Sequence, residues 1–299
     1  MGDLYRYEAD NIYRQPVRSV TRVDADSLIL SMPAYSPRLQ RFAVKIVTEF
    51  KNNPSKYSLP VQGGLILLID GRDSSILATL DAPMVTAIRT GAVSGLATEL
   101  LSRRNSKNVG VIGSGQQART QLEAICAVRE ISKVSVYSRN KPNAAQFARE
   151  MSNELGVDIE AKDDRKRALA NMDIVILATN SFVPVMNWSE VSQGCHINSI
   201  GTLPDRTEVD IDTVCNSRLF VDNRSAVPLE AGDVIGALRS GRIADTHMIG
   251  DLSDVILNKV SGRTNDTEVT LFKSVGFALQ DVYASSYVYD KIRSSNPAN

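Results

Sequence analysis

The sequence has 299 residues, of which 43% are hydrophobic and 23% are charged, as is typical of a soluble globular protein with one large domain or two ordinary ones. Its 34 basic and 34 acidic residues balance, and no strongly basic run occurs, which argues against a nucleic-acid or membrane-surface partner. Three separated cysteines and two histidines show no metal-ligand spacing, and no apolar run is long enough to span a membrane. We therefore expect a cytoplasmic protein with no metal site, no nucleic-acid partner and no membrane segment.

The first 98 residues predict an α+β module with a mostly antiparallel sheet. Short strands are expected at residues 18–23, 27–32, 41–50, 64–69 and 76–80. The last two are separated by a turn that contains Asp70 and Gly71, and Asp-Gly between apolar runs favours a hairpin. Asp81 is a suitable N-cap for a long helix over residues 83–103, which we expect to join two domains.

The segment from Asn108 to Ala118 carries the most informative motif in the chain. An apolar run that predicts a strand is followed by Gly113 and Gly115, with Ala118 in the third place of a G-x-G-x-x-G/A pattern, and then by an amphipathic helix. Gly113 permits a tight turn, Gly115 lets the backbone approach a pyrophosphate, and Ala118 lets the helix pack closely on the strand. The alternative interpretation is an ordinary strand-to-helix turn with two glycines.

Strands and helices alternate beyond residue 107, which predicts a parallel, doubly wound sheet. The expected strands are residues 109–112, 134–138, 173–178, 195–200 and 219–221, and the expected helices are residues 116–130, 143–155 and 164–170. A long amphipathic helix is expected over residues 267–289, and we expect it to return to the first domain. The predicted fold class is α/β, with a Rossmann dinucleotide-binding domain at 99–269 and an α+β domain formed by 1–98 and 270–299.

The end of the second Rossmann strand bears on the choice of cofactor. An NAD-specific site usually has a carboxylate there to hold the ribose 2′-hydroxyl, but this chain has Ser138 and Arg139, followed by Lys141. A hydroxyl and a guanidinium accept a 2′-phosphate that a carboxylate would repel. We therefore favour NADP(H) over NAD(H). The alternative is that Arg139 is a solvated loop residue.

Polar and small residues follow two other predicted strands. Thr179 comes directly after the strand at 173–178, and Ile200 and Gly201 end the strand at 195–200. Both places are carboxyl ends of parallel strands, where open α/β sheets bind ligands. Capping and turn chemistry explains Thr179 equally well. For Ile200-Gly201 a ligand role is favoured, because a glycine lets a flat ring approach.

Three cations in the first domain are candidates for binding an anionic substrate. They are Arg18, Lys45 in an apolar setting, and Arg89 early in the helix that contains many small residues. A lysine flanked by apolar residues on a strand usually faces solvent by alternation. An arginine near the start of a helix opposes the helix dipole, so another purpose is more plausible for Arg89. Composition alone singles out none of the three.

Motifs along nearly the whole chain resemble, in order, those of the ornithine cyclodeaminase/mu-crystallin family. They are Gln15-Pro-Val-Arg18, Met32-Pro-Ala-Tyr35, Lys45-Ile-Val47, Thr86-Ala-Ile-Arg-Thr90, Gly113-Ser-Gly-Gln-Gln-Ala118, His196-Ile-Asn-Ser-Ile-Gly201, Gly232-Asp233 and Phe272-Lys-Ser-Val-Gly276. The resemblance implies a homodimer in which the α+β domain binds substrate and forms the dimer. It also implies hydride transfer between a nicotinamide and the α-carbon of an amino or imino acid, as in alanine dehydrogenases and in ketimine or pyrroline-2-carboxylate reductases. The partner is then a small amino, imino or 2-oxo acid.

The resemblance also implies residue roles. Arg18, Lys45 and Arg89 would hold the substrate carboxylate and polarise the carbonyl or imine, and Lys45 could act as acid or base if burial lowers its pKa. The residues assigned to the cofactor are Thr90, Gly113, Gly115, Gln116, Gln117, Ser138, Arg139, Asn140, Thr179, Ile200, Gly201 and Ser274.

Two departures from the family pattern affect these expectations. Ornithine cyclodeaminases carry a catalytic Asp between the glycine and proline of a loop that here reads Gly201-Thr-Leu-Pro204 and is one residue shorter. Asp205 could replace that Asp only if the loop shifts, and Arg206 resembles a basic residue that lines the substrate site; both are included among the catalytic candidates. Ornithine cyclodeaminase and a non-catalytic NADPH-dependent binding protein of mu-crystallin type remain alternatives. Family members also carry further residues before Gln15, and the alternatives are a first domain that lacks a strand and a helix or a wrongly chosen start codon.

Overall fold

The computed structural model describes residues 1–7 and 15–295, and the chain forms two compact units. Unit 1 consists of Met1–Arg89 and Phe277–Asn299, and unit 2 of Thr90–Gly276. The first division falls inside helix α3 (Ala82–Leu101), earlier than the boundary expected at residue 98, and the second falls later than the boundary expected at 269/270. An uninterrupted helix gives no sequence signal where one compact unit passes into the next.

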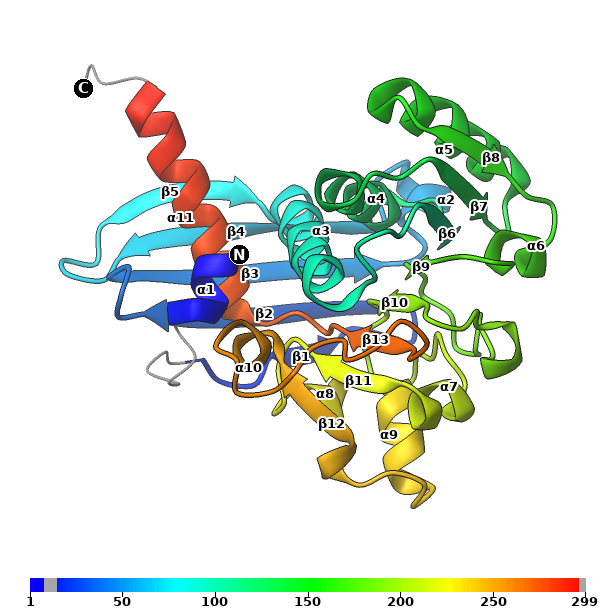
Figure 1. Cartoon of the computed structure of the whole chain (residues 1–299). Helices are drawn as coiled ribbons and strands as arrows, with labels where there is room; N and C mark the ends of the chain where they lie inside the picture. The colour runs from blue at the N-terminus through cyan, green and yellow to red at the C-terminus, as the bar shows by residue number, and fades with distance from the viewer. Residues whose placement is uncertain (8–14, 296–299) are drawn as a thin grey trace. The chain divides into compact units, whose positions relative to one another are not determined.

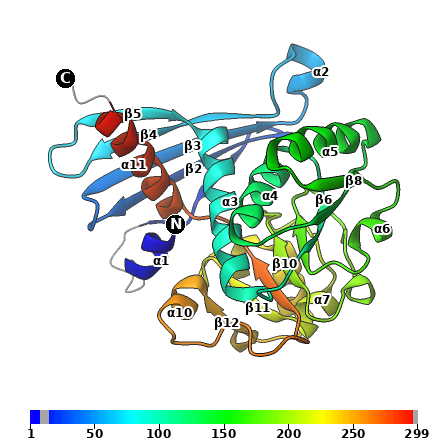
Figure 2. The same ribbon diagram turned by 45° about the horizontal axis from the view of Figure 1, so that its top comes forward.

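Unit 1 is built on a five-stranded antiparallel sheet in the order β1-β2-β3-β4-β5 (Figure 1). The strands are β1 (Ser19–Arg22), β2 (Ser27–Ser36), β3 (Arg41–Phe50), β4 (Gln62–Asp70) and β5 (Ile76–Asp81). The helices of this unit include α1 (Gly2–Tyr7), α2 (Asn53–Tyr57) and α11 (Ala278–Ser295), and α11 packs on β2, β3 and β4, as Figure 2 also shows. The predicted α+β module, including the hairpin at Asp70-Gly71, is confirmed.

Alternation along β3 gives the sheet of unit 1 two different faces. Ala43, Lys45 and Glu49 are buried on the face that carries α11. Ile46 points to the opposite face, where it pairs with Leu65 of β4, and these two side chains are 40% and 41% exposed. We call this opposite surface the open face; it consists of Phe42, Val44, Ile46, Leu65, Leu67 and Ile69.

Unit 2 is a parallel, eight-stranded sheet in the order β12-β11-β13-β10-β9-β6-β7-β8. The strands are β6 (Asn108–Ile112), β7 (Lys133–Tyr137), β8 (Asp158–Ala161), β9 (Ile174–Leu177), β10 (His196–Ser199), β11 (Arg218–Val221), β12 (Met248–Asp251) and β13 (Thr270–Lys273). The predicted doubly wound sheet is confirmed. Chain order reverses between β6 and β9, and such a switch point is where open α/β sheets bind ligands.

Both faces of the parallel sheet are covered, because its strands bury alternate side chains in opposite directions. In β9, Ile174 and Ile176 join an apolar cluster with α4 and α5, whereas Val175 and Leu177 join a cluster with α6, α7 and α9. These helices are α4 (Gln116–Val128), α5 (Lys141–Leu155), α6 (Arg165–Leu169), α7 (Ile211–Asn216) and α9 (Gly232–Arg239). Unit 2 also contains two short α-helices, α8 (Val227–Glu230) and α10 (Leu252–Ile256).

The helix expected over residues 267–289 was wrong in nearly its first half, because α11 begins only at Ala278. Thr270–Lys273 is instead strand β13, which lies between β10 and β11 with all four side chains buried. A strand buried on both faces has no alternating pattern, so its apolar run extended the helical periodicity that follows it. Gly276 has a φ of 72°, and α11 begins only at Ala278. This helix belongs to unit 1.

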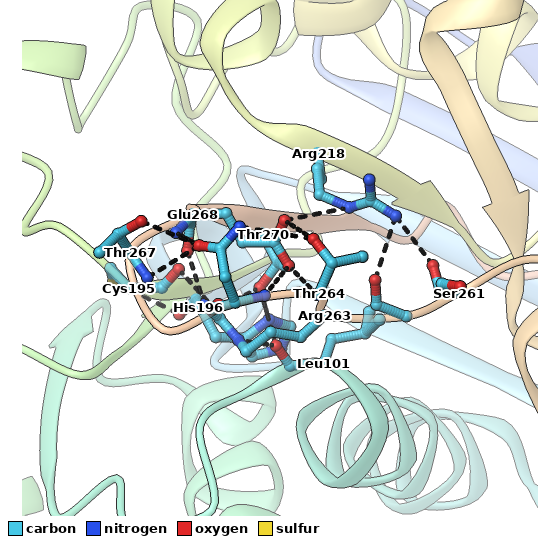
Figure 3. Close-up of polar contacts among 12 residues, drawn as sticks. Leu101, Cys195, His196, Arg218, Ser261, Arg263, Thr264, Thr267, Glu268 and Thr270 are labelled. Carbon is cyan, nitrogen blue, oxygen red and sulfur yellow. Dashed lines mark hydrogen bonds and ion pairs between the residues drawn. The ribbon is translucent and has the colours of Figure 1, made fainter.

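A cluster of polar contacts around Arg263 fixes the C-terminus of α3 to the sheet of unit 2 (Figure 3). The Arg263 guanidinium donates to the carbonyl of Leu101 at 2.7 Å, to the carbonyl of Glu268 at 2.6 Å and to the hydroxyl of Thr270 at 3.0 Å. The last carbonyls of a helix have no partner inside it, so these contacts complete the end of α3. His196 is fully buried beside them, with Nδ1 2.9 Å from Thr270 Oγ1, and burial lowers the pKa of its imidazole to about 3.

Candidate functional site

The glycine-rich turn between β6 and α4 lies at the switch point of the parallel sheet. Gly113 has a φ of 117°, and a Cβ at this position would stand 2.4 Å from the carbonyl oxygen of Ala178. Its N–H donates to the carbonyl of Tyr137 at 2.9 Å. Both the positive φ and the close contact with Ala178 require a glycine at position 113, where the sequence predicts a tight turn.

The N-terminus of α4 fits an anionic ligand. Gly115 is the N-cap, and no heavy atom of the described residues outside its chain neighbours would lie within 4 Å of a Cβ placed there. The first N–H groups of a helix have no intrahelical acceptor and stand at the positive end of the dipole. Gln116 and Gln117 open the helix beside this space. The geometry thus suits the pyrophosphate of a dinucleotide, which the sequence motif predicts.

The segment after β7 presents donors and no carboxylate. Ser138 is half-buried, and Arg139 is exposed. The side-chain oxygen of Asn140 accepts from the N–H of Asn143 at 3.1 Å, so Asn140 caps α5. Capping of α5 accounts for Asn140 without a cofactor. Arg139 has no such capping role in the described residues.

A largely buried network connects the ends of β9, β10 and β13, with only Thr179 partly exposed. The Glu208 carboxylate accepts from the N–H of Thr179 at 2.7 Å and from the N–H of Gly201 at 2.7 Å. It also accepts from the Ser199 hydroxyl at 2.8 Å, which in turn accepts from Lys273 Nζ at 2.9 Å. We call this set, together with Asp233, the Glu208 network. Burial raises the pKa of the Glu208 carboxyl.

The Glu208 network gives Gly201 a different reason for being glycine. A Cβ at Gly201 would stand 2.8 Å from Cδ of Glu208, so the space on that side is filled by the carboxylate. The sequence interpretation gave this space to a flat ring, whereas the Glu208 carboxylate already occupies it, and contact of Gly201 with a ligand from another direction remains a prediction. Ile200 is half-buried, and its N–H donates to Leu177 at the end of β9.

Asp222 organises the segment that follows β13. Its carboxylate accepts from the Ser274 hydroxyl at 2.8 Å and from the N–H of Gly276 at 2.7 Å. Ser274 is buried, so its hydroxyl already has a partner within the protein. Its predicted contact with a cofactor remains a prediction.

Three charged side chains meet on the α11 face of unit 1. Asp281 contacts Lys45 Nζ at 2.8 Å and Arg89 Nε at 3.1 Å, and all three are at most 5% exposed. Arg89 also donates to Gln280, whose amide donates to Tyr5 Oη at 2.9 Å. The cluster therefore holds two cations against one carboxylate in a buried setting.

This environment makes Lys45 an acid–base group near neutrality. Burial is the largest cause, and together with the nearby charges of Arg89 and Arg18 it lowers the pKa of the ammonium from 10.5 to about 7, against the opposing effect of Asp281. Arg18 is half-buried, and its charge acts on Lys45. The structure thus brings the three predicted cations into one electrostatic system.

The two remaining catalytic candidates belong to unit 2. Arg206 is 9% exposed, whereas Asp205 and Pro204 are exposed. The loop before them contains Leu203, whose φ of 98° is rare for a side chain of its kind. Thr90, predicted to touch the cofactor, is also in unit 2 and is buried.

Sequence reasoning missed the acidic members of both clusters. Asp281 lies in a helix with ordinary amphipathic character, and Glu208 lies in a loop. Of the Glu208 network, the family motifs had pointed to Asp233 and Lys273 but not to Glu208 itself. Within residues 1–7 and 15–295, no group of three or more His, Cys, Asp or Glu side chains is placed to hold a metal ion. No helix in the same ranges is long and apolar enough to cross a membrane.

Comparison with known proteins gives matches over almost the whole chain. The sequence model of the ornithine cyclodeaminase/mu-crystallin family matches residues 1–296. A Δ1-pyrroline-2-carboxylate reductase from Bacillus cereus is 33% identical over 288 residues, which cover 95% of this chain and 88% of that protein.

Two solved structures are similar throughout. The Δ1-pyrroline-2-carboxylate reductase of Thermococcus litoralis, in complex with NADH and L-proline, has a TM-score of 0.94 and 38% identity, covering 98% of this chain and 91% of that one. An archaeal alanine dehydrogenase dimer with bound NAD has a TM-score of 0.91 and 29% identity, covering 99% of this chain and 90% of that one.

Proposed function

Because the chain belongs to the ornithine cyclodeaminase/mu-crystallin family, we propose that it is a nicotinamide-dependent oxidoreductase acting at the α-carbon of an amino or imino acid. The observation that carries the proposal is the buried Lys45–Asp281–Arg89 cluster, which offers a near-neutral proton donor beside a second cation. We favour reduction of a cyclic 2-imino acid, since the B. cereus and T. litoralis relatives are pyrroline-2-carboxylate reductases.

Unit 2 is the proposed dinucleotide-binding part. The free space at Gly115 and the N-terminus of α4 would receive the pyrophosphate, and the segments at Thr179 and Gly201 would frame the nicotinamide. The bound nicotinamide supplies the hydride; the chain supplies alignment and the proton. The predicted contacts of Thr90, Gln116, Gln117, Ile200 and Ser274 belong to this proposal.

We propose a preference for NADP(H), although the nicotinamide cofactors named for the two similar structures are NADH and NAD. Support comes from the end of β7, where Ser138 and the exposed Arg139 stand without a neighbouring carboxylate. A guanidinium forms a bidentate, charge-assisted contact with phosphate. NAD(H) preference is the competing outcome of the same measurement.

Unit 1 is the proposed source of the substrate-binding cations. Protonated Lys45 would donate a proton to the imine nitrogen of the substrate or bind the substrate carboxylate. Arg89 would bind that carboxylate with its planar guanidinium. Asp281 and Gln280 both contact the guanidinium of Arg89. A substrate carboxylate must therefore compete with Asp281, and Arg18 would add to the attraction.

Formation of proline from ornithine is the less favoured function. The loop from Gly201 to Pro204 offers no carboxylate, and Leu203 has no proton to give or take. Asp205 is exposed, and Pro204 fixes the backbone before it. Asp205 and Arg206 remain candidates only if this loop moves.

A homodimer is also part of the proposal, through the open face of unit 1. Its six side chains are apolar, contiguous in the register of β3 and β4, and half-buried or exposed. Contiguous apolar surface of this kind marks protein–protein contacts. An Ile46→Lys exchange should therefore convert a dimer into a monomer in light scattering, whereas a chain that is monomeric from the start contradicts the dimer.

The decisive assay is oxidation of NADPH or NADH with a panel of substrates. The panel contains cyclic imino acids, 2-oxo acids with ammonia or methylamine, and ornithine with proline measured directly. Turnover of an imine, and its loss in Lys45→Met, supports the proposed enzyme. Tight NADPH binding without turnover of any panel member favours the non-catalytic binding protein instead.

A further inference from the structure

We propose that Glu208 is a positioning residue that holds the carboxyl ends of β9 and β10 at the separation needed by the nicotinamide end of the cofactor. The inference rests on the dinucleotide binding proposed for unit 2. Glu208 was not among the predicted site residues, and it is 0% exposed, so its role is to act through the residues it binds.

The two oxygens of the carboxylate each serve one strand end. Oε1 accepts from the N–H and the hydroxyl of Thr179, at 2.7 Å and 2.9 Å. Oε2 accepts from the N–H of Gly201 at 2.7 Å and from the Ser199 hydroxyl at 2.8 Å. The ladder between β9 and β10 ends with the pair Leu177 and Ser199. One more backbone hydrogen bond follows, from the N–H of Ile200 to the carbonyl of Leu177 at 3.2 Å, and beyond it the carboxylate connects the two strand ends.

Stability alone gives a poor account of this arrangement. A buried carboxylate has a large desolvation cost, which its hydrogen bonds and a nearby cation only offset. Lys273 supplies that cation through Ser199 and also contacts Asp233 at 2.8 Å, with both side chains fully buried. An apolar side chain would fill the space without that cost, but it would leave the N–H groups of Thr179 and Gly201 without an acceptor.

The geometry explains why a carboxylate is suited to this position. Only an ionised carboxylate accepts at both oxygens, whereas an amide presents one oxygen and one NH2 group. In Glu208→Gln the NH2 group must face the donors of one strand end, so that end moves away. Glu208→Asp keeps the charge but is one methylene shorter, so it reaches only one strand end.

The test compares two ligands that share the adenosine end. We expect Glu208→Gln to weaken NADPH binding roughly 10–100-fold, the effect of leaving one buried donor unsatisfied. Binding of 2′,5′-ADP, which lacks the nicotinamide, should stay within about twofold of wild type, because β9 and β10 frame only the nicotinamide end. Both affinities are measured by calorimetry on the full chain.

Glu190→Gln is the matched control. Glu190 is also mostly buried, contacts Arg165 at 2.6 Å and belongs to the same unit, but it bonds to neither strand end. It should lower stability without changing the ratio of the two affinities. If Glu208→Gln does not fold, Ser199→Ala removes one donor to Oε2 and must change the same ratio in the same direction.

Equal loss of both affinities in folded Glu208→Gln, or no loss, overturns the inference. The same holds if Ser199→Ala, used in its place, leaves the ratio unchanged. Failure of the proposed function has a different signature, because wild type would then bind neither NADPH nor NADH.

Discussion

The buried histidine of the Arg263 cluster should make the protein sensitive to mild acid. His196 is fully buried, and burial together with the positive charges of Arg263 and Arg129 lowers the pKa of its imidazole from 6.5 to about 3. Between these values the unfolded chain binds a proton that the folded chain does not. The stabilisation is therefore fully present above pH 6.5 and is lost as the pH falls toward 3.

The size of the effect follows from the two pKa values of His196. Each pH unit below 6.5 costs about 1.4 kcal/mol, so the free energy of unfolding should fall by about 2 kcal/mol between pH 8 and pH 5 from this group alone. The assay is urea denaturation at both pH values, in which a probe of unit 2 monitors unfolding. His196→Gln should lower the free energy of unfolding at pH 8. It should also reduce the difference in unfolding free energy between pH 8 and pH 5 by about 2 kcal/mol.

His247→Gln is the control for this experiment. His247 is the only other histidine of the sequence, and its Nε2 contacts the carbonyl of Val214 at 2.8 Å, so this exchange also removes an imidazole and one hydrogen bond from unit 2. If the free energy of unfolding changes by the same amount between pH 8 and pH 5 in wild type and in His196→Gln, the reasoning about the buried imidazole is refuted.

Three further exchanges and one assay of the wild type test the proposed chemistry. Arg139→Ala should weaken NADPH binding by about 1–3 kcal/mol with little effect on NADH, and equal losses would remove the 2′-phosphate assignment. Arg89→Lys should reduce kcat/KM for an imino acid at least tenfold with cofactor affinity nearly unchanged, since lysine lacks the bidentate fork; near-full activity would make Arg89 structural. With Lys45 as proton donor, kcat/KM for reduction should fall about tenfold per pH unit above about 7, and Asp281→Asn should shift this limb to lower pH because the carboxylate raises the pKa of Lys45; an unmoved limb would exclude Lys45. Wild type should release no appreciable proline from ornithine, because Leu203 has no proton to give or take. Robust release of proline would show instead that the chain is an ornithine cyclodeaminase.

Much of the fold was readable because its signals are local. The run after Asn108 has apolar residues, glycines and a helix in immediate succession, and Asp81 caps α3 through the N–H of Met84 at 2.7 Å, as predicted. β13 was missed because Thr270–Lys273 is buried on both faces, and such a strand carries no period of its own. The strands β8 (Asp-Ile-Glu-Ala) and β12 (Met-Ile-Gly-Asp) were missed as well, since neither contains the continuous apolar run that revealed β9.

The sites were predictable to the extent that their residues belong to motifs. Lys45 and Arg89 were found through the family resemblance, whereas the alternation rule alone would have turned Lys45 toward solvent. Asp281 was missed because it pairs with residues far away in the sequence, and nothing near it in α11 signals that pairing. Glu208 was missed for the same reason, because its partners follow two different strands.

Strand β3 assigns different tasks to its odd-numbered and even-numbered positions. Lys45 points toward α11 and Asp281, while its neighbours Val44 and Ile46 lie on the open face. Successive side chains of a strand alternate, so adding or removing one residue exchanges the two faces of everything that follows. A single-residue deletion near Ala43 would place an apolar side chain against Asp281 and an ammonium among apolar neighbours. Insertions and deletions should therefore be tolerated in the turns at either end of β3 but not within it, however conservative the residue involved.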